Sequence, residues 1–202
     1  MLESTARQSA LERFRKAGGI LRTSQAQRLG IHPRTLYLLR DDGEIEQLSR
    51  GVYRLAELPP PGEPDLMAVA TRVPKAVVCL ISALHVHGLT SEIPHEASIA
   101  LPPGTKRPEI DYPPTRVFWF SGDSYDQGVE TREMDGVQVK IYTSAKTIAD
   151  CFKFRNKIGI DVAVEALRNG LGEGRVRPAE LLRHARICRV ERVIMPYLEA
   201  ML

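Results

Sequence analysis

The segment from residue 24 to residue 55 constrains the fold of this chain more than any other part of the sequence. It begins with Ser24, which we expect to be the N-cap of a short helix that ends at Gly30. His32-Pro33 then begins a second helix, because a proline at the first helical position loses no backbone hydrogen bond, and Asp42-Gly43 ends it. The sequence therefore predicts two short helices joined by a tight turn.

A two-stranded ribbon is predicted directly after these helices. Ile45–Leu48 and Val52–Leu55 are strand-like runs, separated by Ser49-Arg50-Gly51, which has the composition of a turn. A further helix precedes the segment, with apolar residues at helical spacing from Ala10 to Ala17. This order of elements is that of a winged helix-turn-helix, in which the ribbon is the wing.

The second helix has the division of faces that a DNA-reading helix needs. Leu36 and Leu39 fall on one stripe, and we expect them to pack inward. The remaining faces carry Arg34, Thr35, Tyr37 and Leu38. An arginine can donate two hydrogen bonds to a guanine edge, and a threonine or leucine can contact a thymine methyl group. We therefore predict that these four side chains face double-stranded DNA in its major groove.

Phosphate contacts are expected at the periphery of this fold. Ser24 and Gln25, at the start of the first helix, and Arg50, at the tip of the wing, are placed to contact the DNA backbone. Asp41 and Asp42 would be repelled by phosphate, so we place them away from the interface. The alternative is a generic helical hairpin beside a ribbon, with arginines that are merely solvated.

Charge is distributed unevenly along the chain, although the net charge is only +3. Residues 1–55 carry a balance of +4, residues 56–152 of −5, and residues 153–202 of +4. The basic C-terminal segment has two interpretations: a second nucleic-acid surface, or helices whose long cationic side chains lie over apolar surface. Leu181 and Ala185 give one of these helices an inward stripe, which fits the second interpretation.

A proline-rich run, Leu58–Pro64, divides the chain. Consecutive prolines cannot continue a helix or donate hydrogen bonds to a β-ladder, and they favour a stiff, extended connector. We therefore predict a winged helix-turn-helix domain at residues 1–57, a linker at residues 58–64 and a second domain at residues 65–202.

The second domain mixes strands with helices. Ala76–Leu84 is apolar enough for a buried strand or a buried helix, and its periodicity does not decide between them. Strands are expected at residues 97–101 and 116–120, and a hairpin around Asp135-Gly136. The pattern is helical from Ser144 onward. The predicted fold class is therefore α+β: an N-terminal winged helix-turn-helix domain, then a mixed α/β domain with a helical C-terminal end.

The sequence also resembles a known family. Its N-terminal part carries the pattern GxxxRTSQAxxLGIHPRTLYxLxxxGEIEQLSRGVYRL, which is similar to the N-terminal domain of the AbiEi-type antitoxins of bacterial type IV toxin–antitoxin systems. The resemblance continues to about residue 170. The segments that carry it there are Val78–Thr90, Ile93–Glu96, Gly136–Tyr142, Lys146–Asp150 and Lys157–Gly159.

This resemblance implies a bacterial repressor that reads an inverted repeat in its own promoter. It also implies a functional antagonist of a nucleotidyltransferase-like toxin that forms no stable complex with that toxin, often in phage defence. Because a palindromic site recruits two copies, we expect self-association on DNA. The alternative is a stand-alone winged-helix transcriptional regulator.

Two other residue patterns suggest catalysis, and neither is complete. His85-Val86-His87 with His95-Glu96 offers metal-ligating side chains, but a zinc enzyme needs more converging ligands. Glu109-Ile110-Asp111 with Lys106 offers the residue types of a divalent-ion nuclease, but no apolar strand flanks them. We expect no cofactor, no metal and no enzymatic activity. The alternatives are a nucleic-acid-processing enzyme targeted by the winged helix, and a protein-interaction module.

The remaining features concern the cellular compartment. Cys79, Cys151 and Cys188 are widely spaced, which argues against a disulfide framework and favours buried reduced thiols. No apolar run approaches the roughly 20 residues of a membrane span. The charged N-terminus lacks the apolar core of a signal peptide. We therefore expect a cytoplasmic protein.

Overall fold

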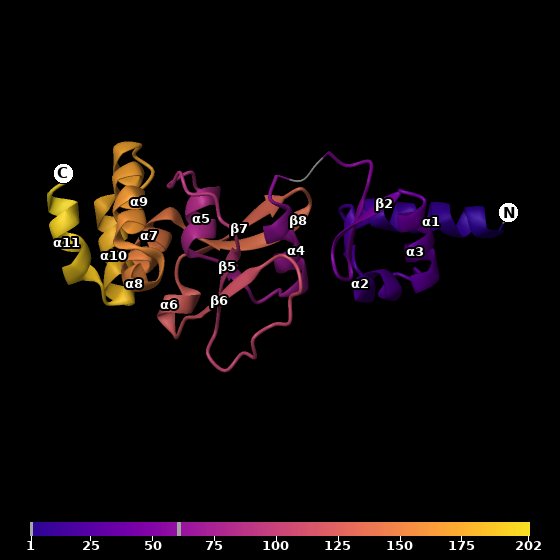
Figure 1. Ribbon diagram of the computed structural model, residues 1–202, viewed down its shortest axis with the longest axis horizontal. Helices are drawn as coiled ribbons and strands as arrows, with labels where there is room; N and C mark the ends of the chain where they lie inside the picture. Colours follow the sequence, from indigo (N-terminus) through magenta and orange to yellow (C-terminus); the bar gives the residue numbers. More distant parts are fainter. Residues whose placement is uncertain (1, 60–61) are drawn as a thin grey trace. The chain divides into compact units, whose positions relative to one another are not determined.

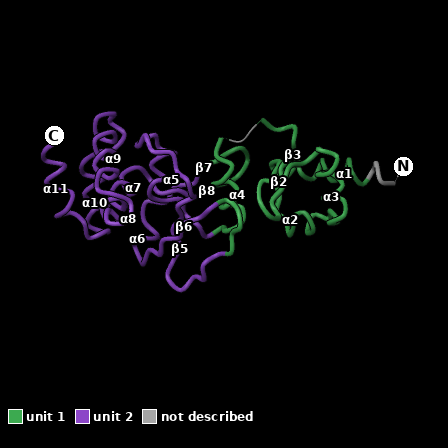
Figure 2. The backbone as a smooth tube through the Cα atoms, viewed as in Figure 1, with its two compact units in different colours: residues 1–74, 109–113, 132–139 green, residues 75–108, 114–131, 140–202 purple. Residues whose placement is uncertain are grey.

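The structure is a computed structural model that describes residues 2–59 and 62–202. Pro60 and Pro61 of the predicted linker lie outside the described residues. Two compact units make up the chain (Figure 2): unit 1 contains residues 1–74, 109–113 and 132–139, and unit 2 contains residues 75–108, 114–131 and 140–202. Because the units are sets of contacting residues, the domain limits at residues 57 and 65 remain predictions.

The N-terminal part has the predicted order of elements (Figure 1). These are α1 (Leu2–Lys16), β1 (Ile20–Arg22), α2 (Thr23–Arg28), α3 (Pro33–Asp41), β2 (Ile45–Ser49), β3 (Val52–Leu55) and α4 (Pro64–Arg72). The predicted ribbon of β2 and β3 gains a third strand, because β1 pairs antiparallel with β3. The strand order is therefore β1-β3-β2.

The core of this part lies between the three helices and the small sheet. Phe14 of α1, Leu36 and Leu39 of α3, and Ile45 of β2 are all at most 1% exposed, and they pack in one cluster with Leu55 of β3. Burial of each such side chain stabilises the fold by about 1.5–3 kcal/mol. The predicted inward stripe of the second helix is confirmed.

The rest of the chain forms a mixed sheet and a group of helices. The elements are β4 (Val77–Val78), α5 (Leu80–Val86), β5 (Ala97–Leu101), β6 (Thr115–Trp119), α6 (Asp123–Asp126), β7 (Val129–Met134), β8 (Val137–Tyr142), α7 (Ser144–Lys153), α8 (Arg155–Ile158), α9 (Ile160–Gly172), α10 (Pro178–Cys188) and α11 (Glu191–Glu199). The strand order is β6-β5-β4-β8-β7. β5 runs antiparallel to β4 and parallel to β6, and β4 runs parallel to β8.

The segment Ala76–Leu84, whose periodicity does not decide between a strand and a helix, contains both. A two-residue strand, β4, is followed directly by helix α5. The hairpin prediction is also confirmed, since Asp135 and Gly136 between β7 and β8 both have positive φ (45° and 84°), as a two-residue turn of this kind requires. The confirmed α+β fold class follows from these two sheets and their helices.

Helix α7 lies at the centre of the C-terminal helices. It packs against α5, α9 and α10, and Figure 1 shows α9, α10 and α11 gathered beside it. Ala145, Ile148 and Phe152 of α7 are at most 2% exposed within the core cluster of unit 2. Cys79, Cys151 and Cys188 are buried free thiols, as predicted.

Candidate nucleic-acid interface

Helix α3 is built by local signals that fix where it begins and how it is turned. His32 is its N-cap, and the His32 Nδ1 accepts a hydrogen bond from the Arg34 backbone N–H at 3.2 Å. Pro33 occupies the first helical position, where its missing N–H costs no hydrogen bond. Leu36 and Leu39 are buried, so the rotation of the helix about its axis is fixed.

The opposite side of α3 is open to solvent and unusually apolar. Arg34 is exposed and Thr35 is half-buried. Tyr37 and Leu38 are 49% and 38% exposed, which is a high exposure for large apolar side chains that are next to each other. The Arg40 guanidinium lies 5.3 Å from the Tyr37 ring centroid and holds that ring on the helix surface. The four predicted base-reading side chains therefore lie where a ligand can reach them.

Helix α2 begins two residues earlier than predicted, so Ser24 is not its N-cap. Arg22 occupies that position, and its backbone N–H donates to the Gln25 side-chain oxygen at 2.8 Å. The reason is that Thr23 already has helical geometry, and the glutamine three residues beyond Arg22 satisfies the exposed N–H. Ser24 and Gln25 remain exposed, although one end of the Gln25 amide is engaged in this cap.

The wing tip carries the exposed arginine that the sequence singled out. The Arg50 side chain is 79% exposed, and its guanidinium Nη1 lies 3.2 Å from Asp111 Oδ2 within unit 1. Exposed pairs of this kind contribute at most about 1 kcal/mol, so the guanidinium can exchange this carboxylate for a phosphate. Gly51 follows with a φ of 73°, which the turn requires. The contact with Asp111 was not predicted, because 61 residues separate the two side chains.

A second arginine of the wing has a structural role. Arg54 is 4% exposed, pairs with Glu46 at 3.1 Å and donates to the backbone oxygens of Leu58 and Pro59, each at 2.7 Å. Its guanidinium is therefore committed to holding β3 against the residues that follow it, and it is not a candidate for DNA contact.

Sequence reasoning missed a group of arginines around the start of α2. Burial lowers the pKa of the Arg22 guanidinium, and the positive charges of Arg72 and Arg28 lower it further. Arg22 donates to the Arg72 carbonyl at 2.8 Å, and Arg72 donates to the Arg50 carbonyl at 3.0 Å. These arginines add positive charge around the start of α2, where Ser24 and Gln25 lie. The signal in the sequence was the pair Arg22 and Arg28, which lie at the N-cap and at the last residue of a six-residue helix.

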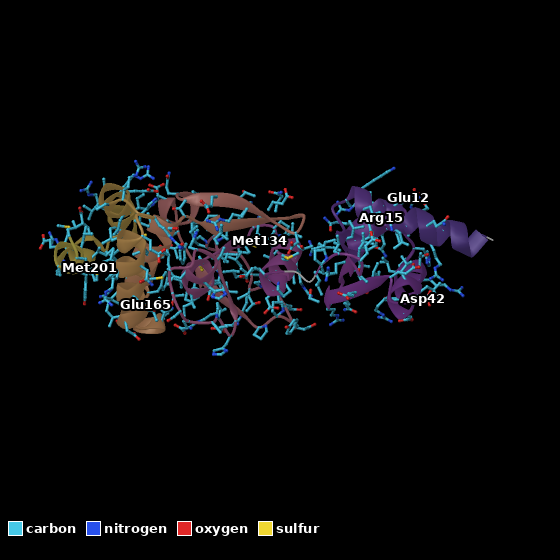
Figure 3. The ribbon with its side chains drawn as sticks, turned by 90° about the horizontal axis from the view of Figure 1, so that it is seen from above. Glu12, Arg15, Asp42, Met134, Glu165 and Met201 are labelled. Atoms are coloured by element: carbon cyan, nitrogen blue, oxygen red, sulfur yellow. The ribbon has the colours of Figure 1, made fainter. Side chains whose placement is uncertain are left out.

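Acidic residues near α3 are engaged elsewhere. Asp42, labelled in Figure 3, lies 2.6 Å from Arg7 of α1, and Asp41 lies 2.7 Å from the adjacent Arg40. Their negative charges are therefore partly neutralised, and repulsion toward DNA at this end of the helix is reduced.

Residues of the two incomplete catalytic patterns, at 85–87 and 109–111, contact groups outside those patterns. The His87 ring is buried, with its Nε2 2.7 Å from the Tyr142 carbonyl, and this contact ties α5 to β8. Asp111 pairs with Arg50, and Glu109 lies on an exposed stretch without regular secondary structure. Within residues 2–59 and 62–202, no group of three or more His, Cys, Asp or Glu side chains is arranged to hold a metal ion.

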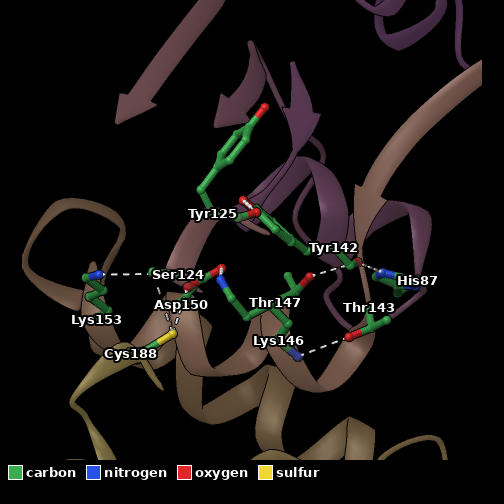
Figure 4. A network of polar contacts seen from close by, with 10 residues as sticks. All are labelled: His87, Ser124, Tyr125, Tyr142, Thr143, Lys146, Thr147, Asp150, Lys153 and Cys188. Atoms are coloured by element: carbon green, nitrogen blue, oxygen red, sulfur yellow. Dashed lines mark hydrogen bonds and ion pairs between the residues drawn. The ribbon is translucent and has the colours of Figure 1, made fainter. Parts of the chain in front are cut away.

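Unit 2 contains a buried polar network around α7 (Figure 4). The Lys146 Nζ donates to Asp150 Oδ2 at 2.5 Å, and both side chains are 0% exposed. The Cys188 thiol donates to the other carboxylate oxygen of Asp150 at 3.1 Å. The Lys146 ammonium also lies 4.1 Å from the Tyr142 ring centroid.

In the part of the chain that the structure describes, no helix has the length and apolar character needed to cross a membrane.

The fold of residues 8–56 defines the class of this N-terminal domain. A first helix, a tight turn, a second helix with one exposed face and a β-ribbon with a basic tip form a winged helix-turn-helix. The same residues, 8–56, match the family model described as "Transcriptional regulator, AbiEi antitoxin". The N-terminal domain is thus similar to the AbiEi antitoxin domain of transcriptional regulators.

The match ends at residue 56, so the resemblance of residues 78–159 to the same family remains a prediction. A search of curated proteins found no match to this chain.

Proposed function

We propose that this protein is a DNA-binding transcriptional repressor of its own operon. The observation that carries the proposal is the exposed face of α3, where Arg34, Tyr37 and Leu38 project from a helix that is anchored on its other side by buried leucines. Solvent gives no favourable partner to two adjacent large apolar side chains, whereas a major groove offers base edges and thymine methyl groups. The match of residues 8–56 to a transcriptional regulator family supports this proposal.

In this proposal, each part of the N-terminal domain has a separate role. Arg34 reads a guanine edge, with Tyr37 and Leu38 packed against neighbouring bases, and Thr35 contacts a phosphate or a thymine methyl group. Ser24 and Gln25 position the bracing helix on the backbone, and Arg50 does so at the wing. Two copies occupy an inverted repeat in the promoter and block access of the polymerase.

We further propose an antitoxin role, which rests on the family of the N-terminal domain. The antagonised protein would be a nucleotidyltransferase-like toxin, encoded next to this gene and opposed without a stable complex. Co-expression of this chain should restore the growth of cells that express the neighbouring toxin, and the two proteins should not co-purify. Absence of rescue would leave a stand-alone winged-helix regulator, which is the second candidate function.

A promoter reporter tests the repressor proposal. The region upstream of the gene is fused to a fluorescent reporter in a host that lacks the operon, and the protein is supplied in trans. We expect expression to fall when the protein is present. We expect Arg34→Ala to relieve this repression, because loss of a bidentate contact to guanine costs about 1–3 kcal/mol of binding free energy.

The matched control is Arg15→Ala. Arg15 is also an exposed arginine of the N-terminal domain (Figure 3), but it lies on α1 and pairs with Glu57 at 2.9 Å. Both variants lower the net charge by one, so the control isolates the position of the charge. Equal repression by both variants would refute the reading role of Arg34.

A further inference from the structure

Unit 2 contains a cavity of about 520 Å³ that the proposed DNA-binding function does not use. It is lined by residues 121–124 around the start of α6, residues 187–189 at the end of α10, and Lys153 of α7. Three elements that are distant in the sequence therefore converge on one space. Its volume lies within the range of about 300–1,000 Å³ that is typical of small-molecule sites.

Hydrogen-bond donors face this cavity from two of its walls. The Lys153 Nζ donates to Ser124 Oγ at 3.2 Å, and Ser124 is 5% exposed (Figure 4). Because the Ser124 oxygen accepts from the lysine, its hydroxyl proton is available to another acceptor, and its other contact, the Cys188 sulfur, is distant at 4.0 Å. Lys153 retains two further ammonium protons. This wall is therefore suited to an acceptor with several oxygens.

Arg189 supplies a second cation at an unusual backbone position. It ends α10 in the left-handed conformation, with φ 59° and ψ 39°, where glycine is the favoured residue. A residue with a Cβ has a conformational cost there, and Arg189 is one of the residues that line the cavity. Within residues 2–59 and 62–202, neither Arg189 nor Lys153 forms an ion pair with a carboxylate. Both cations can therefore meet an anion.

The inner wall of the cavity does not offer a nucleophile. The Cys188 thiol donates to Asp150 at 3.1 Å, and burial together with the Asp150 charge raises the pKa of this thiol to about 12. The thiol therefore stays protonated, and the Asp150 carboxylate behind it is paired with Lys146 at 2.5 Å. These groups are suited to shaping a binding site and not to attacking a bound molecule.

We propose that this cavity binds the phosphate group of a small phosphorylated molecule through Lys153, Arg189 and the Ser124 hydroxyl. A phosphate monoester offers three acceptor oxygens and nearly two negative charges, which match an ammonium, a forked guanidinium and a hydroxyl donor. Asp123, also in the lining, is the one carboxylate that opposes the anion, and the ionised side chains of the lining sum to +1. The site is independent of the proposed repressor function.

The test is an NMR titration of the full chain with inorganic phosphate, at constant ionic strength maintained with sodium chloride. We expect saturable shifts of the backbone amides of residues 121–124 and 187–189, because these residues line the cavity. Arg189→Gly should weaken phosphate binding by at least roughly tenfold, because a charge-assisted contact is lost. Its thermal unfolding midpoint should be unchanged or raised, since glycine relieves the left-handed backbone.

Two further variants test the charge of the site and provide a control. Asp123→Asn should tighten phosphate binding by roughly two- to fivefold, because the opposing charge is removed. Arg192→Ala, an exposed arginine three residues beyond Arg189 and outside the cavity lining, should bind phosphate as the wild-type protein does. Arg189→Gly with unchanged phosphate affinity would overturn the proposal, as would shifts that do not include residues 121–124.

The phosphate could also belong to a nucleic-acid backbone, and a second titration distinguishes that source. A single-stranded DNA 12-mer without terminal phosphates is added in place of inorganic phosphate. We expect no shifts at residues 121–124, because a backbone phosphodiester has one negative charge and two esterified oxygens and therefore matches these donors less well than a phosphate monoester does. Shifts at these residues with the 12-mer, lost in Arg189→Gly, would overturn the assignment to a small molecule.

Discussion

The buried pair of Lys146 and Asp150 makes a quantitative prediction about unit 2. Lys146→Met leaves the Asp150 carboxylate in the core, with the Cys188 thiol as its remaining side-chain donor among the described residues. Removal of one member of a fully buried ion pair costs about 3–5 kcal/mol. The ammonium also lies 4.1 Å from the Tyr142 ring centroid and 4.9 Å from that of Phe120, and these contacts are lost as well. We therefore expect the free energy of unfolding to fall by about 4 kcal/mol, near the middle of that range.

The chain provides its own probe for this measurement. Its single tryptophan, Trp119, lies in β6 of unit 2 and is 47% exposed, so its fluorescence reports the unfolding of that unit during urea denaturation. For a chain of this length, about 4 kcal/mol corresponds to a fall of roughly 8–16 °C in the thermal midpoint. A loss below about 1 kcal/mol would refute the reasoning, because an uncompensated buried charge cannot be that inexpensive.

The double variant Lys146→Met/Asp150→Leu separates loss of the pair from loss of packing. Both charges are then absent, so most of the stability should return, leaving a deficit of about 1–2 kcal/mol. The pH dependence gives a second check. Burial raises the pKa of Asp150, and Lys146 opposes this shift, so the carboxyl in Lys146→Met has a still higher pKa. A raised folded-state pKa makes a carboxyl favour folding at low pH, so the deficit of Lys146→Met should shrink as the pH falls.

Two further predictions concern the same unit. Burial, followed by the Arg183 and Lys146 charges, lowers the pKa of His184 to about 4. The contribution of His184 to stability is therefore present above pH 6.5 and is lost as the pH falls from 6.5 through 4. In urea titrations at several pH values, His184→Gln should remove roughly 1–3 kcal/mol of this pH dependence. Gly128 has a φ of 74°, and an added Cβ would lie 2.8 Å from Lys146 Cβ, so Gly128→Ala should cost about 2–5 kcal/mol. Gly104→Ala, with a φ of 77° and open space around it, should cost only about 1–2 kcal/mol, and equal losses would contradict the steric argument.

Local signals made most of the N-terminal fold predictable. Pro33 and Gly43 bound α3, Leu36 and Leu39 set its rotation, and Gly51 marks the turn of the wing. Each of these signals acts over a few residues, so tertiary packing did not need to be known. The start of α2 was misplaced, because Ser24 has the chemistry of an N-cap but Gln25 caps the backbone from within the helix.

Burial and long-range contacts were the features that the sequence did not reveal. Lys146 and Asp150 are four residues apart on one helix, a spacing that normally indicates a solvated surface pair, yet both are fully buried. Ala76–Leu84 divides into a strand and a helix because burial on every side removes the periodicity that distinguishes them. The contact of Arg50 with Asp111 likewise depends on the fold.

The measurement that tests the central claim most directly is fluorescence anisotropy of the full chain on its own upstream DNA and on a scrambled duplex, across a salt series. We expect a preference for the upstream DNA of roughly 10³-fold or more, with an affinity that falls steeply as the salt concentration rises. In the same assay, Arg34→Ala should lose part of this preference, whereas Arg50→Ala should weaken both duplexes alike. Equal and weak binding of the wild-type protein to both duplexes would contradict the claim that this winged helix-turn-helix reads DNA sequence.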